Sequence, residues 1–160
     1  MINKIVFPIL IALVLLPIQL VVIPLISISN IIPNIVLIYV LLYSFRYGQI
    51  AGTIFAFFIG ILYDTASSSL LGSGMFSFTL AAFIAGYFYK EDFKDILLNI
   101  HIFIFALLLS SFIFFLFYSV LGTEGIIVES NFSFITFALF SSVYNIIFAL
   151  SLYLIPRNKL

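Results

Sequence analysis

Residues 5–45 read IVFPILIALVLLPIQLVVIPLISISNIIPNIVLIYVLLYSF and carry no charged side chain. One charge at mid-bilayer costs roughly 3 kcal/mol and a span needs about 20 apolar residues, so this stretch is long enough for two transmembrane helices. The turn-rich segment 27–34 interrupts the stretch and predicts where the first helix gives way to the second. We therefore expect an integral membrane protein that begins with a helical pair.

The charged residues divide the rest of the chain into four further apolar segments, each able to hold one helix. Their unbroken apolar runs favour helices over the ten-residue alternation of a membrane β-barrel. The sequence predicts an all-α integral membrane protein. It is expected to form a single domain, residues 1–160, of six helices at about 5–26, 31–46, 48–63, 74–89, 96–120 and 132–155.

Composition supports the same class. The chain is 65% hydrophobic and its mean hydropathy is +1.37, which leaves too little polar surface to cover a soluble globule. Six basic and six acidic residues give a net charge of zero without a long basic run, which argues against nucleic-acid binding. With no cysteine, disulfides, thiolate nucleophiles and thiolate metal sites are excluded.

The distribution of cations predicts orientation. If six spans begin with a cytoplasmic N-terminus, every basic residue falls on the cytoplasmic side and both termini are cytoplasmic. These residues are Lys4, Arg46, Lys90, Lys94, Arg157 and Lys159. The predicted external loops hold Asp64, Glu124 and Glu129. Tyrosines are expected near helix ends, where an amphipathic ring suits the interface: Tyr43, Tyr47, Tyr63, Tyr87, Tyr89, Tyr118 and Tyr153.

The first apolar segment lacks a small-residue cleavage site, and we read it as a retained helix. Pro8, Pro17 and Pro24 are expected to kink it or end it early. The second to fourth helices are predicted to be short, at roughly 15 residues or 22 Å. Parts of their connections should then dip into the membrane, shielded by protein.

Two stripes of small residues predict close packing of the third and fourth helices. Small side chains at four-residue spacing let two backbones approach in lipid. We expect a tight antiparallel hairpin, although such residues also recur in membrane helices by chance. The stripes are Gly48, Gly52, Ala56 and Gly60, answered by Ser73, Ser77, Ala81, Ala85 and Gly86.

Asp64 is predicted at the C-terminal end of the third helix, where the helix dipole disfavours an anion. One interpretation is that its carboxylate accepts from backbone amides of 65–67 or caps a short helix in 67–69. The other is contact with a basic or hydroxyl group of a partner. Both remain open. A catalytic role would need a second acid, base or nucleophile, and only serines are nearby, so no catalytic residue is assigned.

Polar side chains recur near mid-depth on the last two helices. They are Ser110 and Ser111 on the fifth, with Ser141, Ser142, Tyr144 and Asn145 on the sixth. Asn145 is expected to hydrogen-bond across helices, whereas the serines can instead bond to their own preceding carbonyls. No helix interior is predicted to hold a charge, which gives an ion or proton pathway little support.

The remaining polar features suggest no bound group. His101 is the single histidine and lacks ligand-spaced neighbours, so neither a metal nor a cofactor is expected. Segment 90–95 reads as a solvated cytoplasmic loop or a docking point for a cytoplasmic protein, with Asp95 a candidate N-cap.

Several motifs follow one another along the chain: Pro33-Asn34 with the three residues after it, Gly48 and Gly52, the run from Gly60 to Ser67 with Asp64 at its centre, Leu71-Gly72, and Ala85-Gly86-Tyr87. Together they resemble the family of the bacterial rod shape-determining protein MreD. The order fits over essentially the whole chain. Asp64, Ser67, Gly72, Pro33 and Asn34 are the motif and partner-contact candidates. The family usually has Asp where this chain has Asn34, and often Gly and Pro where it has Ser68 and Leu70. A charge at 34 is then dispensable, and the loop after Asp64 is expected to turn less sharply.

The resemblance implies a non-enzymatic inner-membrane scaffold of the cell-elongation machinery. It would bind the bitopic protein MreC, help couple MreB filaments to peptidoglycan synthases, and contact membrane lipids. The family is similar in fold to substrate-binding subunits of energy-coupling-factor transporters, so the alternative is a vitamin- or solute-binding subunit. Those subunits present an Ala-x-x-x-Ala stripe on the first helix, where this chain offers only Ala12. A lipid-modifying enzyme would need a His, Asp and Arg cluster that the chain lacks.

Overall fold

A computed structural model describes residues 3–28, 31–90, 99–122 and 134–153. Within these residues the chain is helical apart from its connections and an isolated bridge between Ile28 and Ile31. The all-α class is therefore confirmed. The helices are α1 (Asn3–Pro17), the π-helix η1 (Ile18–Val22), the 3-10 helix η2 (Ile23–Ile26), α2 (Ile35–Tyr47), α3 (Gln49–Ser67), α4 (Ser73–Gly86), α6 (Ile100–Leu121) and α8 (Phe134–Tyr153).

Four of these helical segments are long and apolar enough to cross a membrane: Phe7–Ile26, Gln49–Ser67, Ile100–Leu121 and Phe134–Ser151. Four of the six predicted spans therefore correspond to helical segments that are long enough to cross a membrane. α2 and α4 are apolar but shorter, with 13 and 14 residues. At 1.5 Å per residue they reach about 20 Å, less than the thickness of the hydrocarbon layer.

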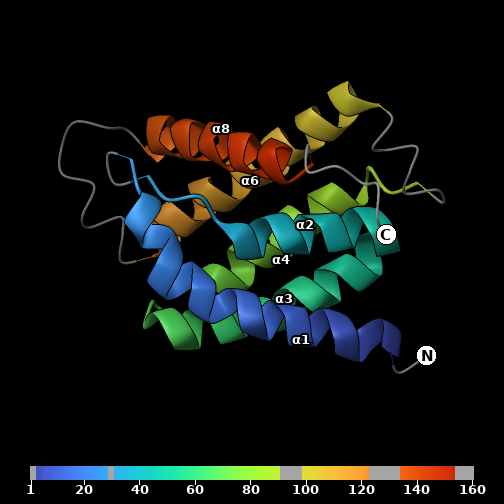
Figure 1. Cartoon of the computed structure of the whole chain (residues 1–160), viewed down its shortest axis with the longest axis horizontal. Coiled ribbons are helices and arrows are strands. Elements are labelled where there is room, and N and C mark those ends of the chain that lie inside the picture. Colours follow the sequence, from blue (N-terminus) through green and yellow to red (C-terminus); the bar gives the residue numbers. More distant parts are fainter. Residues whose placement is uncertain (1–2, 29–30, 91–98, 123–133, 154–160) are drawn as a thin grey trace.

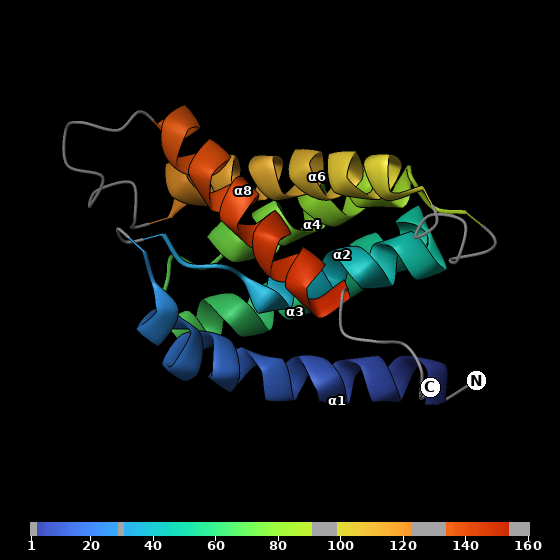
Figure 2. The ribbon, with the colours of Figure 1, turned by 45° about the horizontal axis from the view of Figure 1, so that its top comes forward.

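Successive helices run in alternating directions through the bundle (Figure 1). α4 packs against α3 on one side and against α6 on the other, and α8 covers α6. α1 lies along α2 and α3, on the side of the bundle away from α8 (Figure 2). The start of α1, the end of α2 and the chain after α4 share one end of the molecule, which we call the basic end because these segments hold Lys4, Arg46 and Lys90. The turn between α3 and α4, with Asp64, lies at the other end.

The first helical segment changes its winding at its prolines. Pro8 is accommodated inside α1, and Pro17 ends the regular α-helix. The π-helix follows at once, and Pro24 lies in the 3-10 turn that closes the segment. Proline removes a backbone donor and crowds the preceding turn, which accounts for the break. The predicted disruption of this helix is confirmed.

α3 is longer than the sequence predicts. It has 19 residues and continues through Asp64 to Ser67, so Asp64 lies inside its last turn rather than after its end. The hydroxyl of Thr65 donates to the carbonyls of Ile61 and Leu62, and that of Ser67 donates to the carbonyl of Tyr63. The hydroxyls of Thr65 and Ser67 thus hydrogen-bond to carbonyls of the preceding turn, which is compatible with a helix that continues beyond Asp64.

Aromatic side chains fill the core between α3, α4 and α6. The Phe78 ring lies 4.6 Å from that of Phe114 and 5.2 Å from that of Tyr63, centroid to centroid. Tyr63 in turn makes an edge contact with Tyr118 at 6.0 Å. Both tyrosines lie near the ends of their helices, as predicted, and their rings are buried in the core of the bundle.

Candidate functional site

Asp64 is 1% exposed and its carboxylate accepts four hydrogen bonds from the segment that follows it. Oδ1 accepts from the backbone N–H of Gly74 at 2.8 Å and from the hydroxyl of Ser69 at 3.1 Å. Oδ2 accepts from the N–H groups of Gly72 at 2.8 Å and Met75 at 3.1 Å. The last turn of α3 therefore holds the first turn of α4.

This arrangement offsets the unfavourable interaction between the Asp64 carboxylate and the C-terminal end of the α3 dipole. The first N–H groups of a helix have no partners within it and carry partial positive charge. Asp64 meets those of α4, so the dipole of one helix offsets that of the other. Asp64 was expected to accept from amides of 65–67, or to cap a helix within 67–69. Residues 65–67 instead belong to α3, and 68–69 follow it directly. The helix that Asp64 caps is α4. Contact with another protein would require these four bonds to open.

The turn between α3 and α4, residues 68–72, is sharp. Ser68 adopts φ 55° and Gly72 φ 107°, and both values lie in the left-handed region. A non-glycine residue pays roughly 1 kcal/mol there. The hydroxyl of Ser69, which donates to Asp64, lies 3.0 Å from that of Ser67. The loop after Asp64, which was expected to turn less sharply than in the family, thus reverses the chain with Ser68 in a conformation that favours glycine.

The α3–α4 hairpin predicted from the small-residue stripes is present, with backbone contact at two points. A Cβ built on Gly60 would collide with the Cα of Met75 and lie 2.9 Å from its nitrogen. A Cβ on Gly86 would collide with the Cα of Gln49. The side chains between these contacts are fully buried: Ala56, Ser77, Ala81 and Ala85. The amide of Gln49 also donates to the carbonyl of Phe83 at 3.2 Å.

Two members of the α3 stripe have other neighbours. A Cβ on Gly52 would lie 2.8 Å from the Cα of Ser44, so this glycine serves the contact between α2 and α3. Residues four apart advance by about 400° around a helix, so the stripe drifts by about 40° at each step. Gly48 precedes α3 with φ 86° and faces the ring of Tyr89. The assignment of the whole stripe to α4 is therefore wrong at Gly52.

A second polar cluster lies inside the bundle, which we call the polar junction: Gln19, Asn34, Ser111 and Asn145. All four side chains are buried. Gln19 donates to the carbonyl of Pro33 at 3.1 Å and accepts from the N–H of Ile35 at 2.8 Å. The Asn34 side chain accepts from the N–H of Leu37 at 2.8 Å and so caps α2. The non-helical backbone before α2 is thus satisfied by protein side chains.

Within the polar junction, Asn145 of α8 connects the start of α2 with α6. Its side-chain oxygen accepts from the N–H of Asn34 at 2.9 Å, and its nitrogen donates to the hydroxyl of Ser111 at 3.2 Å. The predicted hydrogen bond across helices is confirmed. Asn34 caps a helix as well as an aspartate would, without burying a charge. A neutral residue at position 34 therefore suffices to cap α2.

We expect Asn145→Leu to lower the free energy of unfolding by about 2 kcal/mol, because it leaves the buried N–H of Asn34 without an acceptor. Ser111→Ala is the matched control. It removes one hydroxyl and should cost less than about 1 kcal/mol. Unfolding of the full chain in mixed micelles by added dodecyl sulfate, followed by far-ultraviolet circular dichroism, measures both. Equal costs for the two variants would contradict the bond to Asn34.

The other serines near the junction behave differently from one another. The Ser142 hydroxyl donates to the carbonyl of Leu139 at 2.8 Å, the local bond that was expected of these serines. The hydroxyls of Ser110 and Ser141 are buried and have no partner among the described residues. For these two the expectation of a local bond is wrong.

Gln19 is the site residue that the sequence reasoning missed. A glutamine between Pro17 and Pro24 in an otherwise apolar run carried the signal, because an intramembrane polar side chain needs a partner and prolines free backbone groups nearby. His101 is exposed on the first turn of α6. Asp95 lies outside the described residues. Within the described part of the chain, no three His, Asp or Glu side chains gather as a metal site would require.

One comparison with known proteins decides the family. The family model of the rod shape-determining protein MreD matches residues 1–158 of the 160. The chain belongs to the MreD family. This is a family of shape-determining structural proteins, and with the apolar helices described above it identifies a multi-pass membrane protein.

Among curated proteins and among solved structures, no match reaches significance. The expected likeness to substrate-binding subunits of energy-coupling-factor transporters is therefore not supported. In transporters, the free backbone N–H groups at the start of a broken helix can bind a solute. In this chain, Gln19 and Asn34 accept hydrogen bonds from the N–H groups of Ile35 and Leu37 at the start of α2.

Proposed function

We propose that this MreD-family protein is a non-enzymatic scaffold of the bacterial cell-elongation complex. It lies in the inner membrane with both termini in the cytoplasm, binds MreC, and helps couple MreB filaments to peptidoglycan synthases. The match over residues 1–158 carries the proposal, because it places nearly the whole chain in a family named for rod-shape determination. The location of Lys4, Arg46 and Lys90 at one end supports the orientation.

The α3–α4 hairpin supports a scaffold mechanism. Backbone contacts at Gly60 and Gly86 and the four bonds to Asp64 make it rigid. Its outer face on α3 is an exposed apolar ridge, the α3 ridge: Ile50, Ile54, Phe57 and Phe58. A rigid apolar ridge fits the single transmembrane helix of MreC, since helices associate in lipid by packing. We place MreC there.

Co-purification tests this proposal. MreC should be retained by the tagged wild-type chain from solubilised membranes, and the pair Ile54→Ala, Phe58→Ala should weaken retention about tenfold. The matched control is Phe140→Ala, Ile147→Ala on α8, which removes the same two side-chain types at similar exposure: 52% and 59%, against 55% and 60% for Ile54 and Phe58. The control should retain MreC.

The outcomes separate the function from the binding face. Failure of the wild-type chain to retain MreC, and to restore rod shape in cells that lack their own copy, would overturn the function. Retention of MreC by the α3 variant, with loss by the α8 variant, would move the binding face to α8.

A further inference from the structure

The basic end of the bundle carries cations that the scaffold function does not use. Arg46 lies in the last turn of α2, and Lys90 lies four residues after the end of α4. Both side chains are exposed. The guanidinium carbon of Arg46 lies 5.6 Å from the centroid of the Tyr47 ring, within cation–π range. Asp64, the one acidic side chain among the described residues, lies at the opposite end.

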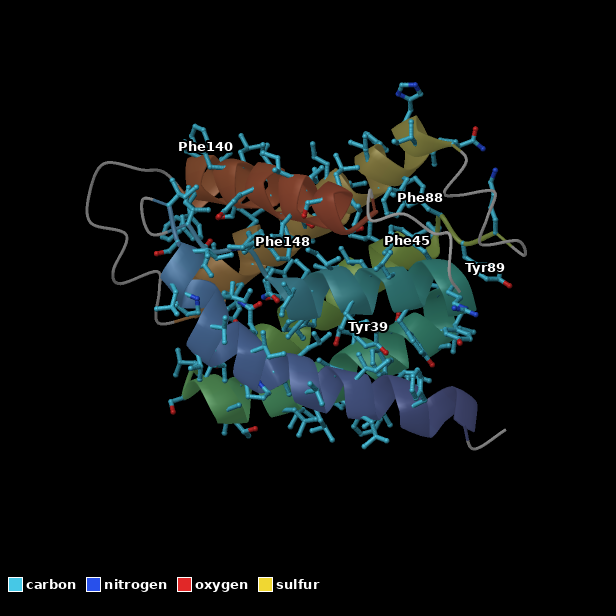
Figure 3. All side chains as sticks on the ribbon, viewed as in Figure 1. Tyr39, Phe45, Phe88, Tyr89, Phe140 and Phe148 are labelled. Atoms are coloured by element: carbon cyan, nitrogen blue, oxygen red, sulfur yellow. The ribbon has the colours of Figure 1, made fainter. Side chains whose placement is uncertain are left out.

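Packing joins the two segments that carry the cations. A single residue, Gly48, joins α2 to α3, and its φ of 86° is one that other residues rarely adopt. The Tyr89 ring covers this glycine, with its Cγ 3.6 Å from a Cβ built there. Figure 3 shows Tyr89 at the basic end of the bundle, where α2 ends. Gly86 meets the backbone of Gln49 one residue further on. The segments that carry Arg46 and Lys90 are therefore packed together at this end of the bundle.

The surroundings of the two cations are those of the membrane interface. Tyr47, Tyr87 and Tyr89 are all exposed at this end, and their amphipathic rings suit the level of lipid headgroups. Directly beyond the turn, α3 exposes Ile50 at 78%. A molecule that binds here meets two cations and phenolic hydroxyls at one level and apolar surface at the next. That sequence of surfaces matches an amphiphile with an anionic head.

We propose that Arg46 and Lys90, with Tyr47 and Tyr89, bind the headgroup of an anionic phospholipid, whose acyl chain lies along α3 from Ile50. Guanidinium and ammonium groups both donate to phosphate, and basic pockets between membrane helices hold such headgroups. The competing use of these cations is internal pairing, because Glu91 and Asp92 follow Lys90 in the sequence. The lipid chain shares Ile50 with the α3 ridge on which we place MreC, so the lipid proposal is tested on the chain without MreC.

Native mass spectrometry of the full chain, released from neutral detergent with graded phosphatidylglycerol, tests the proposal. We expect one bound lipid at low concentration and none with phosphatidylcholine. Each cation contributes about fivefold to affinity, so Arg46→Gln with Lys90→Gln should weaken binding about 25-fold. Lys4→Gln with Lys159→Gln removes the same charge elsewhere in the sequence and should change binding less than about twofold.

Three results would overturn the proposal. Unchanged binding in the Arg46, Lys90 variant would mean that the cations are paired internally. An equal loss in the Lys4, Lys159 variant would mean diffuse attraction to an anionic surface rather than a site. Binding of inorganic phosphate alone as tightly as phosphatidylglycerol would mean that α3 contributes nothing and that no amphiphile is selected. Circular dichroism of each variant checks that the bundle is intact.

Discussion

Asp64→Ala is expected to lower the free energy of unfolding of the full chain by about 4 kcal/mol. The substitution removes the acceptor of three backbone N–H groups and one hydroxyl in a place that is 1% exposed, where water cannot replace it. Because those N–H groups begin α4, we expect the α3–α4 hairpin to open first. Dodecyl sulfate titration followed by circular dichroism measures the loss.

Two further variants separate the charge and shape of Asp64 from its neighbours. In Asp64→Asn one oxygen becomes an NH₂ group that faces two donors, so about 2 kcal/mol should be lost. Ser69→Ala removes a single donor to the carboxylate and should cost about 1 kcal/mol. A loss below about 1 kcal/mol for Asp64→Ala would mean that α4 does not need this cap.

Features that depend on lipid as the solvent could be predicted from the sequence. The helices of the described residues lie largely within charge-free segments, because a charge within the bilayer costs too much to be placed there by chance. Small residues at Gly60 and Gly86 predicted the close hairpin, since backbones meet in lipid only where side chains are absent. Prolines predicted the break in the first helix.

Features that depend on tertiary contact could not be predicted. The sequence indicated that Asp64 needs partners but pointed to nearby amides, whereas α3 runs on and the acceptor reaches Gly72, Gly74 and Met75. Local sequence patterns do not show where the N-terminus of the next helix will lie relative to Asp64. Gln19 and Asn34 are 15 positions apart, and Asn145 lies 111 beyond Asn34. Their junction exists only once η1, the start of α2 and α8 have packed together.

Gly60→Leu is expected to cost about 3 kcal/mol or more, because a side chain there meets the backbone of Met75, which cannot move without shifting α4. Gly60→Ala gives the sharper test, because the sign of its effect on the free energy of unfolding distinguishes a close contact from free space. In a helix with free space, alanine is more favourable than glycine by about 1 kcal/mol. At Gly60 the added methyl collides with Met75, so we expect alanine to destabilise the chain. The same titration measures both variants.

Ala66→Leu is the matched control on the same helix, because Ala66 is exposed. It should change the free energy of unfolding by less than about 0.5 kcal/mol. Gly52→Leu should destabilise by a different route, through Ser44 of α2. If Gly60→Ala instead stabilised the chain, α3 and α4 would have to lie further apart than the contact at Met75 allows. The rigid base of the α3 ridge would then be lost, and with it the reason for placing MreC on α3.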